Sequence, residues 1–169
     1  IESDNVEGGR MAASLIARLL KGKGRVIELE GIPGTSAALD RGAGFNEALK
    51  AFPDIKVVAR EVASFEQQKA KKVVLRIMQQ NLMFDGVFAH NDNMILGAAE
   101  ALETRQASSA SVLVGFDGIQ EAREALRQGR INATIAQKPE KMGALAVSSL
   151  ARYWRGEKPV SPIRVELEV

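Results

Sequence analysis

The chain has 169 residues, 46% of them hydrophobic and 26% charged, which are ordinary proportions for a globular domain with a buried core. Its formal net charge is +2, and Lys and Arg are spread along the chain, so no basic stripe indicates nucleic-acid binding. There is no cysteine, which excludes disulfides, cysteine ligands for a metal and a cysteine nucleophile. No apolar run approaches the about 20 residues that a membrane-spanning helix needs.

Apolar residues at helical spacing alternate with short apolar runs along the whole chain. The first helix carries Met11, Leu15 and Leu19 on one stripe, and Ser64 with Gln67 has the spacing of a capping box before a later helix. The expected elements, in order, are a helix to about residue 22, a strand at 25–30, a helix at about 35–52, a strand at 55–60, a helix at about 64–82, a strand at 86–89, a helix around 95–102, a strand at 112–118, a helix around 119–129 with Leu126 inward, a strand at 131–136, a helix around 142–156 and a strand at 164–169.

The clearest strand is VLVGFDG at 112–118, an apolar run that ends on a carboxylate between two glycines. Strands without a polar face are typical of a parallel sheet that is covered on both sides. Strands and helices that alternate at this rhythm predict an α/β fold, with a doubly wound parallel sheet of the Rossmann-like or flavodoxin-like kind in three α/β/α layers.

Four polar side chains follow predicted strands: Arg41, beyond the first strand, and Asn91, Asp117 and Gln137. The carboxyl ends of parallel strands face the same way, and ligands bind at that edge of such a sheet. A guanidinium, two carboxamides and a carboxylate are donors and acceptors of the sort that pair with several hydroxyls. The sequence therefore predicts a site for a polyhydroxy ligand there.

A purely structural interpretation of the same residues stays open. Asp-Gly is a common turn dipeptide, so Asp117 alone indicates a turn as readily as a site. Asn91 and Ser64 could be helix caps. Phe65 and Phe116 could offer ring faces to a sugar, or they could both be core residues.

Arrangements for catalysis or cofactor binding are poor. His90 is the only histidine and has no partners at triad or metal-site spacing, so we interpret it as a loop residue or a donor behind the site. Asp85, Asp92 and Asp117 lack the spacing of a metal motif. The segment GIPGTS is neither a complete dinucleotide loop nor a P-loop. We therefore expect no enzyme activity, no metal and no cofactor.

Four segments together resemble the periplasmic ribose-binding proteins of bacterial ABC transport, which belong to the type I periplasmic sugar-binding family: IELEGIPGTSAALDRGAGF, VFAHNDNMILGAAEAL, VLVGFDG and INATIAQKPEKMGALAV. The similarity runs nearly from end to end in the same order. It implies two Rossmann-like lobes joined by a three-stranded hinge, with sugar between them. This chain resembles the C-terminal part.

The resemblance implies particular ligand-binding residues. His90, where a glutamine is common in ribose binders, and Leu39-Asp40, in place of a more charged pair, depart from the family pattern and leave the sugar open. The residues that match the family's sugar contacts are Arg41, Asn91, Asp117 and Gln137, then Phe65 as an aromatic lining residue, and Ser3 and Ile32 as weaker contacts.

The resemblance also divides the chain. Residues 1–137 would form the C-terminal sugar-binding lobe, 138–158 a hinge-crossing helix that packs on the absent N-terminal lobe, and 159–169 the terminal hinge segment and strand. The opening on Ile1 fits a chain that lacks a larger N-terminal portion. Because an exposed apolar face must be covered, we expect the helix at 140–155 to dock on the sheet edge or to mediate a homodimer.

The implied function is binding of a ribose-like monosaccharide as part of the substrate-binding component of an ABC transport system. The implied location is periplasmic, and the implied partner of the full-length protein is a membrane permease. One lobe alone should bind sugar weakly or not at all. The alternative is the effector-binding core of a lactose-repressor-type transcription regulator, which shares the fold.

Overall fold

The computed structural model describes residues 1–104, 111–158 and 160–169, so Pro159, where the terminal segment was expected to begin, lies outside the described residues. The elements, in chain order, are β1 Glu2–Ser3, α1 Asn5–Leu19, β2 Gly24–Glu30, α2 Ser36–Leu49, β3 Ile55–Val62, α3 Gln67–Gln79, β4 Gly86–Ala89, α4 Asp92–Thr104, β5 Val112–Asp117, α5 Gln120–Arg127, β6 Ala133–Ala136, α6 Pro139–Trp154 and β7 Arg164–Val165. No described helix is long and apolar enough to cross a membrane.

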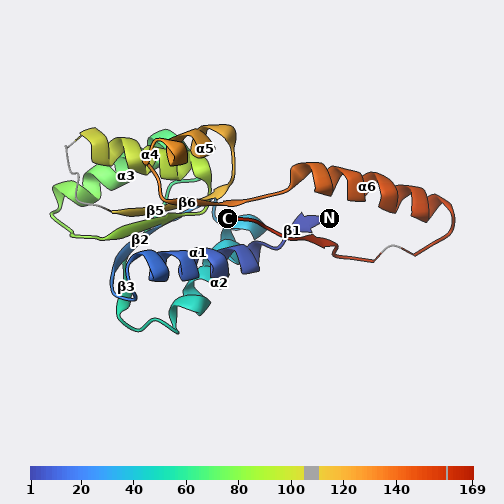
Figure 1. Cartoon of the computed structure of the whole chain (residues 1–169), viewed down its shortest axis with the longest axis horizontal. Helices are drawn as coiled ribbons and strands as arrows, with labels where there is room; N and C mark the ends of the chain where they lie inside the picture. Colours follow the sequence, from blue (N-terminus) through green and yellow to red (C-terminus); the bar gives the residue numbers. More distant parts are fainter. Residues whose placement is uncertain (105–110, 159) are drawn as a thin grey trace.

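A five-stranded parallel sheet in the order β3-β2-β4-β5-β6 forms the centre of the molecule. This is the flavodoxin-like strand order. All five strands run parallel, but successive strands are added on one side of β2 and then, from β4 onwards, on its other side. Helices α1 and α2 cover one face, and α3, α4 and α5 cover the other (Figure 1). The predicted three-layer α/β fold with a doubly wound parallel sheet is confirmed.

Each face of the sheet has its own apolar core. Phe45, Phe88 and Phe116 are fully buried under α1 and α2, and the rings of Phe45 and Phe88 stack with centroids 4.4 Å apart. Ile27 and Leu29 point to the opposite core, beneath α3 and α4. Because both faces are covered, β4 and the first five residues of β5 carry no polar side chain, as the sequence indicated.

Close packing of α1 against α2 places α2 over the edge of the sheet where the strands end. A Cβ atom on Gly9 of α1 would lie 2.2 Å from the main-chain oxygen of Arg41 in α2. Only glycine allows an approach this close. The backbone of Arg41 is therefore held directly against α1.

The predicted capping box at Ser64 and Gln67 is wrong. Ser64 and Phe65 both have left-handed backbone angles, with φ of 55° and 62°, and α3 begins only at Gln67 without a side-chain cap. Gln67 instead donates a 2.5 Å hydrogen bond to Glu100 of α4. The Gln67 side chain is therefore paired with α4 and does not reach back to the Ser64 N–H, as a capping box would require.

Three smaller predictions also change. Leu126 is 40% exposed, and its neighbour Ala125 is buried in its place. The strand expected at 131–136 begins at Ala133, because the Asn132 side chain, rather than its backbone, accepts the Leu113 N–H at 2.7 Å. The strand expected at 164–169 is confined to β7, followed by a single antiparallel bridge at Glu168.

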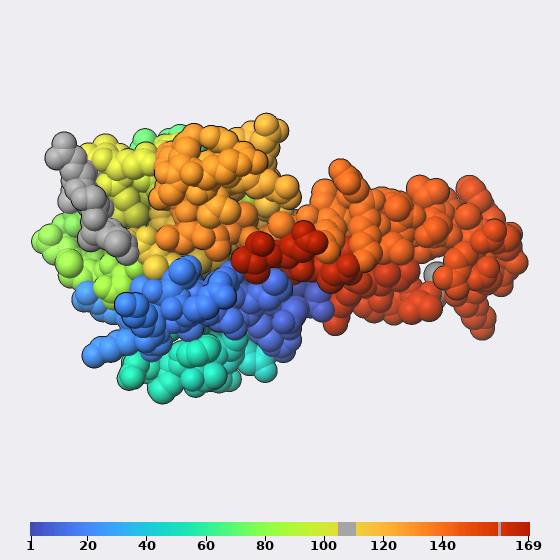
Figure 2. All heavy atoms as spheres, viewed as in Figure 1, coloured from blue at the N-terminus to red at the C-terminus, as the bar shows by residue number. Residues whose placement is uncertain are grey.

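Helix α6 projects away from the rest of the molecule (Figures 1 and 2). None of its residues is buried, and Val147 and Trp154 are 71% and 78% exposed. At its base, β1 pairs with β7 in a separate two-stranded parallel sheet. The prediction that this helix docks on the edge of the main sheet is wrong, and its apolar face stays uncovered in the single chain.

Candidate functional site

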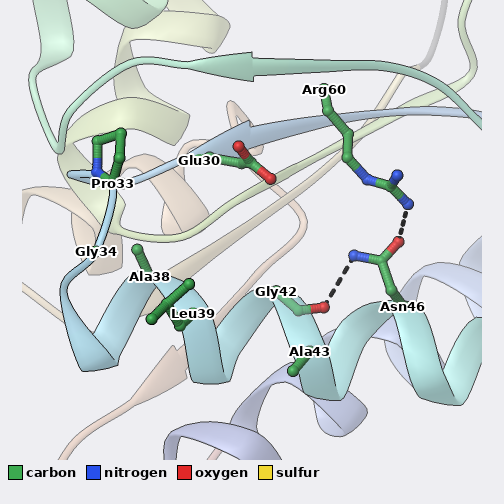
Figure 3. Close-up of a pocket in the computed structure, with 10 residues that line it drawn as sticks. Glu30, Pro33, Gly34, Ala38, Leu39, Gly42, Ala43, Asn46 and Arg60 are labelled. Carbon is green, nitrogen blue, oxygen red and sulfur yellow. Dashed lines mark hydrogen bonds between the residues drawn. The ribbon is translucent and has the colours of Figure 1, made fainter.

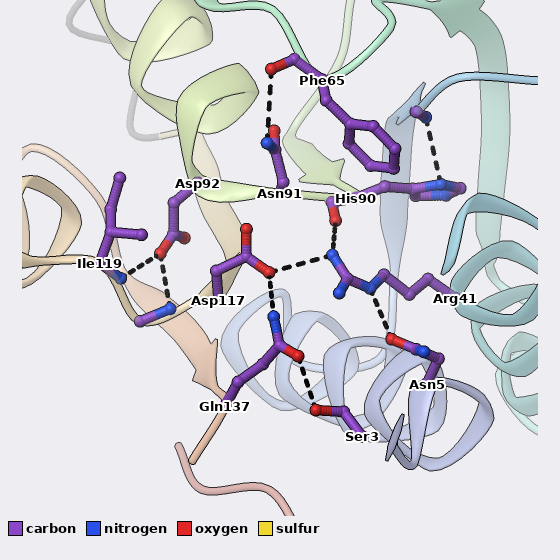
Figure 4. A network of polar contacts seen from close by, with 12 residues as sticks. Ser3, Asn5, Arg41, Phe65, His90, Asn91, Asp92, Asp117, Ile119 and Gln137 are labelled. Carbon is purple, nitrogen blue, oxygen red and sulfur yellow. Dashed lines mark hydrogen bonds and ion pairs between the residues drawn. The ribbon is translucent and has the colours of Figure 1, made fainter. Parts of the chain in front are cut away.

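The four main predicted site residues meet at the carboxyl edge of the sheet (Figure 4). Asp117 is the last residue of β5, and Gln137 and Asn91 follow β6 and β4. Arg41 lies beyond β2 in α2, within the helix that was predicted at about 35–52. It reaches the site from α2, which lies over the same edge.

Asp117 lies at the centre of the polar network and contacts two of the other predicted site residues. Its Oδ1 accepts hydrogen bonds from Arg41 Nη1 at 3.1 Å and from Gln137 Nε2 at 2.7 Å. Burial raises the pKa of Asp117, and the Arg41 charge and the Gln137 hydrogen bond oppose that rise. Its backbone φ of 122° is a left-handed value that most side chains avoid, and such strain concentrates at functional sites.

Several contacts within the protein hold Arg41 in place. Its Nε donates to Asn5 Oδ1 at 2.9 Å, and its Nη1 donates to the main-chain oxygen of His90. Its guanidinium lies 3.7 Å from the centre of the Phe116 ring. Burial lowers the pKa of Arg41, and Asp117 opposes that change, so the side chain keeps its charge.

Two polar atoms at the centre of this network have no partner. Neither Arg41 Nη2 nor Asp117 Oδ2 hydrogen-bonds to any residue that the structure describes. Every buried side-chain nitrogen and oxygen of those residues has a partner, so these two atoms must be accessible to solvent. Arg41 therefore keeps one free donor and Asp117 one free acceptor, and hydroxyl groups can pair with both kinds of atom.

Gln137 connects the site to the base of α6. Its Oε1 accepts a 2.6 Å hydrogen bond from Ser3 Oγ of β1, which fixes the orientation of the carboxamide. Ser3 is itself 4% exposed and lies 3.6 Å from the sulfur of Met142 in α6. The structure therefore brings Ser3 into the network, as a support for Gln137.

Asn91 is a helix cap as well as a site residue. Its Oδ1 accepts from the Met94 N–H at 3.0 Å, which caps α4, and its Nδ2 makes a long 3.4 Å contact with the Phe65 main-chain oxygen. The cap interpretation is therefore correct for Asn91. Its Nδ2 remains the group that could donate to a ligand.

Phe65 stands over Gly31, at the side of the site opposite Gln137 (Figure 4). A Cβ atom on Gly31 would lie 2.1 Å from the Phe65 ring, so the ring rests directly on the glycine backbone. Phe116 is fully buried as a core residue, although its ring face meets Arg41. Ile32 is 47% exposed beside Gly31 and takes no part in the polar network.

Asp92 is an important residue that the sequence analysis considered only as a metal ligand. It is fully buried, and its Oδ2 accepts from the main-chain N–H groups of Gly118 and Ile119 at 2.7 and 2.9 Å. Its Oδ1 accepts from the Thr134 hydroxyl at 2.7 Å. Asp92 thus fixes the turn that directly follows Asp117. The only feature of the sequence that could have pointed to Asp92 is its position directly after the helix cap Asn91.

Burial raises the pKa of Asp92 to about 6, against the hydrogen bond from Thr134, and the nearby charge of Asp117 adds to the rise. The described residues contain no group of three or more His, Cys, Asp or Glu side chains that could hold a metal ion.

A surface groove has a lining that includes none of Arg41, Asn91, Asp117 and Gln137 (Figure 3). It has a volume of about 510 Å³ and runs between α2 and the ends of β2 and β3. Glu30, Asn46 and Arg60 supply its polar walls, and Gly31 is shared with the wall behind Phe65.

The fold is a doubly wound α/β domain with a cluster of polar side chains at the carboxyl edge of its parallel sheet, and comparison with known proteins gives the family. Residues 1–158 match the model of the periplasmic binding protein domain. The chain belongs to this family.

Named relatives are similar along the entire chain. It is 40% identical over 169 residues to the ribose import binding protein RbsB of Haemophilus influenzae, covering all of this chain and 57% of that protein. The RbsB protein of Escherichia coli is also 40% identical over 169 residues, with 56% of its length covered. The chain thus spans a little over half the length of these relatives, and the predicted resemblance is confirmed.

A solved structure shows the same fold. The periplasmic solute-binding protein of an ABC transporter from Actinobacillus succinogenes, with bound D-allose, superposes with a TM-score of 0.93 at 35% identity. The match covers 98% of this chain and 59% of that one.

Proposed function

We propose that this chain is the C-terminal lobe of a monosaccharide-binding protein that serves an ABC import system. The relatives named above are import binding proteins, which supports a transport role over the regulator alternative and over an enzyme. We assign it no catalytic residue, and we place the full-length protein in the periplasm with a membrane permease as its partner.

The observation that carries the proposal is the free pair of atoms at the centre of the network. Arg41 Nη2 and Asp117 Oδ2 have no hydrogen-bond partner among the described residues, while the other polar atoms of both side chains are held by the protein. A pair of adjacent sugar hydroxyls satisfies one donor and one acceptor in this arrangement. Because both side chains are already fixed, binding orders few groups.

The other predicted residues would complete one side of the sugar site. Asn91 Nδ2 would donate to a further hydroxyl, and the Phe65 ring would cover the C–H face of the sugar. Gln137 would fix Asp117 and present its own amide, while Ser3 and Ile32 would make weaker contacts. The sugar that fits these groups is ribose or a related monosaccharide.

We further propose that the missing half completes the site and covers α6. Residues 1–137 would be the sugar-binding lobe, 138–158 the helix that packs on the other lobe, and 159–169 the return segment. The uncovered apolar face of α6 supports this division. Without the second lobe the sugar is bound on one side only, so the affinity should be weak.

The test is a titration of the isotopically labelled chain with D-ribose and D-allose, followed by NMR. We expect the side-chain signals of Arg41, Asn91 and Gln137 to shift together, with dissociation constants in the millimolar range. The side-chain amide signal of Gln128, an exposed residue directly after α5, is the internal control and should not move. Unchanged signals at the three site residues with every monosaccharide would refute the proposal, and submicromolar binding would refute the expected weakness of one lobe.

A further inference from the structure

A buried carboxylate lies behind the proposed site in the middle of a central strand. Glu28 of β2 is fully buried, and burying an unpaired charge in this way is costly. Its Oε1 contacts His90 Nε2 at 3.1 Å, and its Oε2 accepts from Asn46 Nδ2 at 2.9 Å and from Arg60 Nε at 2.8 Å. Burial acts to raise the pKa of Glu28, but these hydrogen bonds have the larger effect, so the pKa is lowered from its usual value.

The hydrogen bonds of His90 define its tautomer. The Gly31 N–H points to His90 Nδ1 at 3.4 Å, so Nδ1 is the acceptor. The ring proton is then on Nε2, which donates to Glu28. His90 is 1% exposed, so both ring nitrogens depend on these two partners.

His90 also contacts both walls of the proposed sugar site (Figure 4). Its main-chain oxygen accepts from Arg41 Nη1, and its ring holds the backbone of Gly31. The ring of Phe65 rests on Gly31, with no space between them for even a Cβ atom. A displacement of His90 must therefore move the guanidinium on one side and the aromatic ring on the other.

We propose that the buried Glu28–His90 pair is a positioning device that sets the separation of Arg41 and Phe65, and so determines how well the site fits a sugar. The proposal rests on the proposed function and deepens it. It extends to Asn46 and Arg60, which fix the far side of Glu28 from the walls of the surface groove (Figure 3). These residues act through others and do not touch the sugar themselves.

The first test needs no substitution. The nitrogen chemical shifts of the His90 ring report which nitrogen carries the proton. A protonated Nε2 and an unprotonated Nδ1 are expected at neutral pH. The opposite tautomer would overturn the proposal, because Gly31 would then face a second donor.

The second test compares two substitutions of His90. Gln can accept from Gly31 and donate to Glu28, so His90→Gln should keep the D-ribose dissociation constant within about threefold. Leu can do neither, so His90→Leu should weaken binding by about tenfold or more and shift the Arg41 Nε–H signal without sugar. Equal affinity of the Leu variant and the wild type would overturn the proposal. So would a Gln variant that loses about tenfold, even if the Leu variant does not fold.

Val74→Ala is the matched control for general destabilisation. Val74 is fully buried in the core on the opposite face of the sheet, so its truncation lowers stability without touching the network. The Arg41 signal and the ribose affinity should match those of the wild type. If the wild type shows no response to any sugar, the proposed function fails, while the ring tautomer and the sugar-free Arg41 signal still decide the positioning role.

Discussion

Gln137 donates a 2.7 Å hydrogen bond to the Oδ1 atom of Asp117, and this contact joins the ends of the neighbouring strands β6 and β5. The same oxygen accepts from Arg41, so protein donors converge on one side of the carboxylate. The other oxygen accepts no hydrogen bond from the described residues. The carboxamide of Gln137 is in turn held by Ser3, so the site is continuous with the strands at the base of α6.

Asp117→Asn should separate binding from folding. Asn accepts a positive φ more readily than most residues, and it keeps one acceptor for Arg41. It removes the charge that pairs with a nearly buried guanidinium, so we expect the free energy of unfolding to fall by about 1–3 kcal/mol. Ribose binding should weaken by about tenfold or more, because the free acceptor is lost or replaced by a donor.

Urea denaturation and NMR titration measure these two effects. Asp54→Asn is the matched control, since Asp54 is exposed between α2 and β3, and it should change neither quantity. Ribose affinity equal to that of the wild type in the Asp117 variant would contradict the assigned role.

The sequence was sufficient for the parts of the site that lie at strand ends. Asn91, Asp117 and Gln137 each follow an apolar run, and parallel strands necessarily bring such residues to one edge. Arg41 meets Asp117 as predicted, but it does so from the middle of α2 rather than from a strand end. It reaches the site because α2 packs closely against α1, and no local pattern reports that packing distance.

The supporting residues could not be predicted, because their roles depend on long-range pairing. Glu28 reads as one polar residue in a strand, and its partner His90 is 62 positions away. Asp92 fixes a turn 26 positions further along the chain. Ser64 shows the converse error, where a local capping pattern was present and tertiary contacts imposed another backbone.

Gly31→Ala should be destabilising only while Phe65 is present. The new Cβ would lie 2.1–2.6 Å from three atoms of the ring, so the ring or the loop after β2 must move. Overpacking of this kind costs about 1–3 kcal/mol. In a Phe65→Ala background the conflict is gone, and the same substitution should then change stability by less than about 0.5 kcal/mol.

A double-mutant cycle by chemical denaturation gives the coupling between the two positions. Gly143→Ala is the control, since a Cβ there meets nothing within 4 Å. A cost of Gly31→Ala that is the same with and without Phe65 would show that the contact is not responsible.

The uncovered face of α6 should lead to self-association at high concentration. Val147, Leu150 and Trp154 are all at least 48% exposed, and pairing with a second copy would remove them from water. Light scattering should show a dimer that Val147→Lys together with Trp154→Lys converts to a monomer. Lys substitutions at the exposed polar positions Ser148 and Arg155 are the control. A wild-type chain that stays monomeric at millimolar concentration would contradict the expected homodimer.

Asp92 should make the chain less stable as the pH rises from about 4 to 7. Burial raises its folded-state pKa from 3.8 to about 6, so the folded chain binds more protons than the unfolded chain in this window. The free energy of unfolding must then fall with rising pH, because the ionised carboxylate is the form that burial disfavours. A difference of roughly two pKa units sets an upper limit of about 3 kcal/mol.

Asp92→Asn isolates this contribution, because the amide can keep all three contacts. Its oxygen can accept from Gly118 and Ile119, and its nitrogen can donate to Thr134, whose hydroxyl then accepts. The variant should match the wild type near pH 4, where the folded carboxyl is protonated, and should become the more stable of the two as the pH rises to 7. Melting temperatures of both proteins across this range measure the effect. A difference between the two proteins that does not change with pH would show that Asp92 titrates at the same pH in the folded and the unfolded chain.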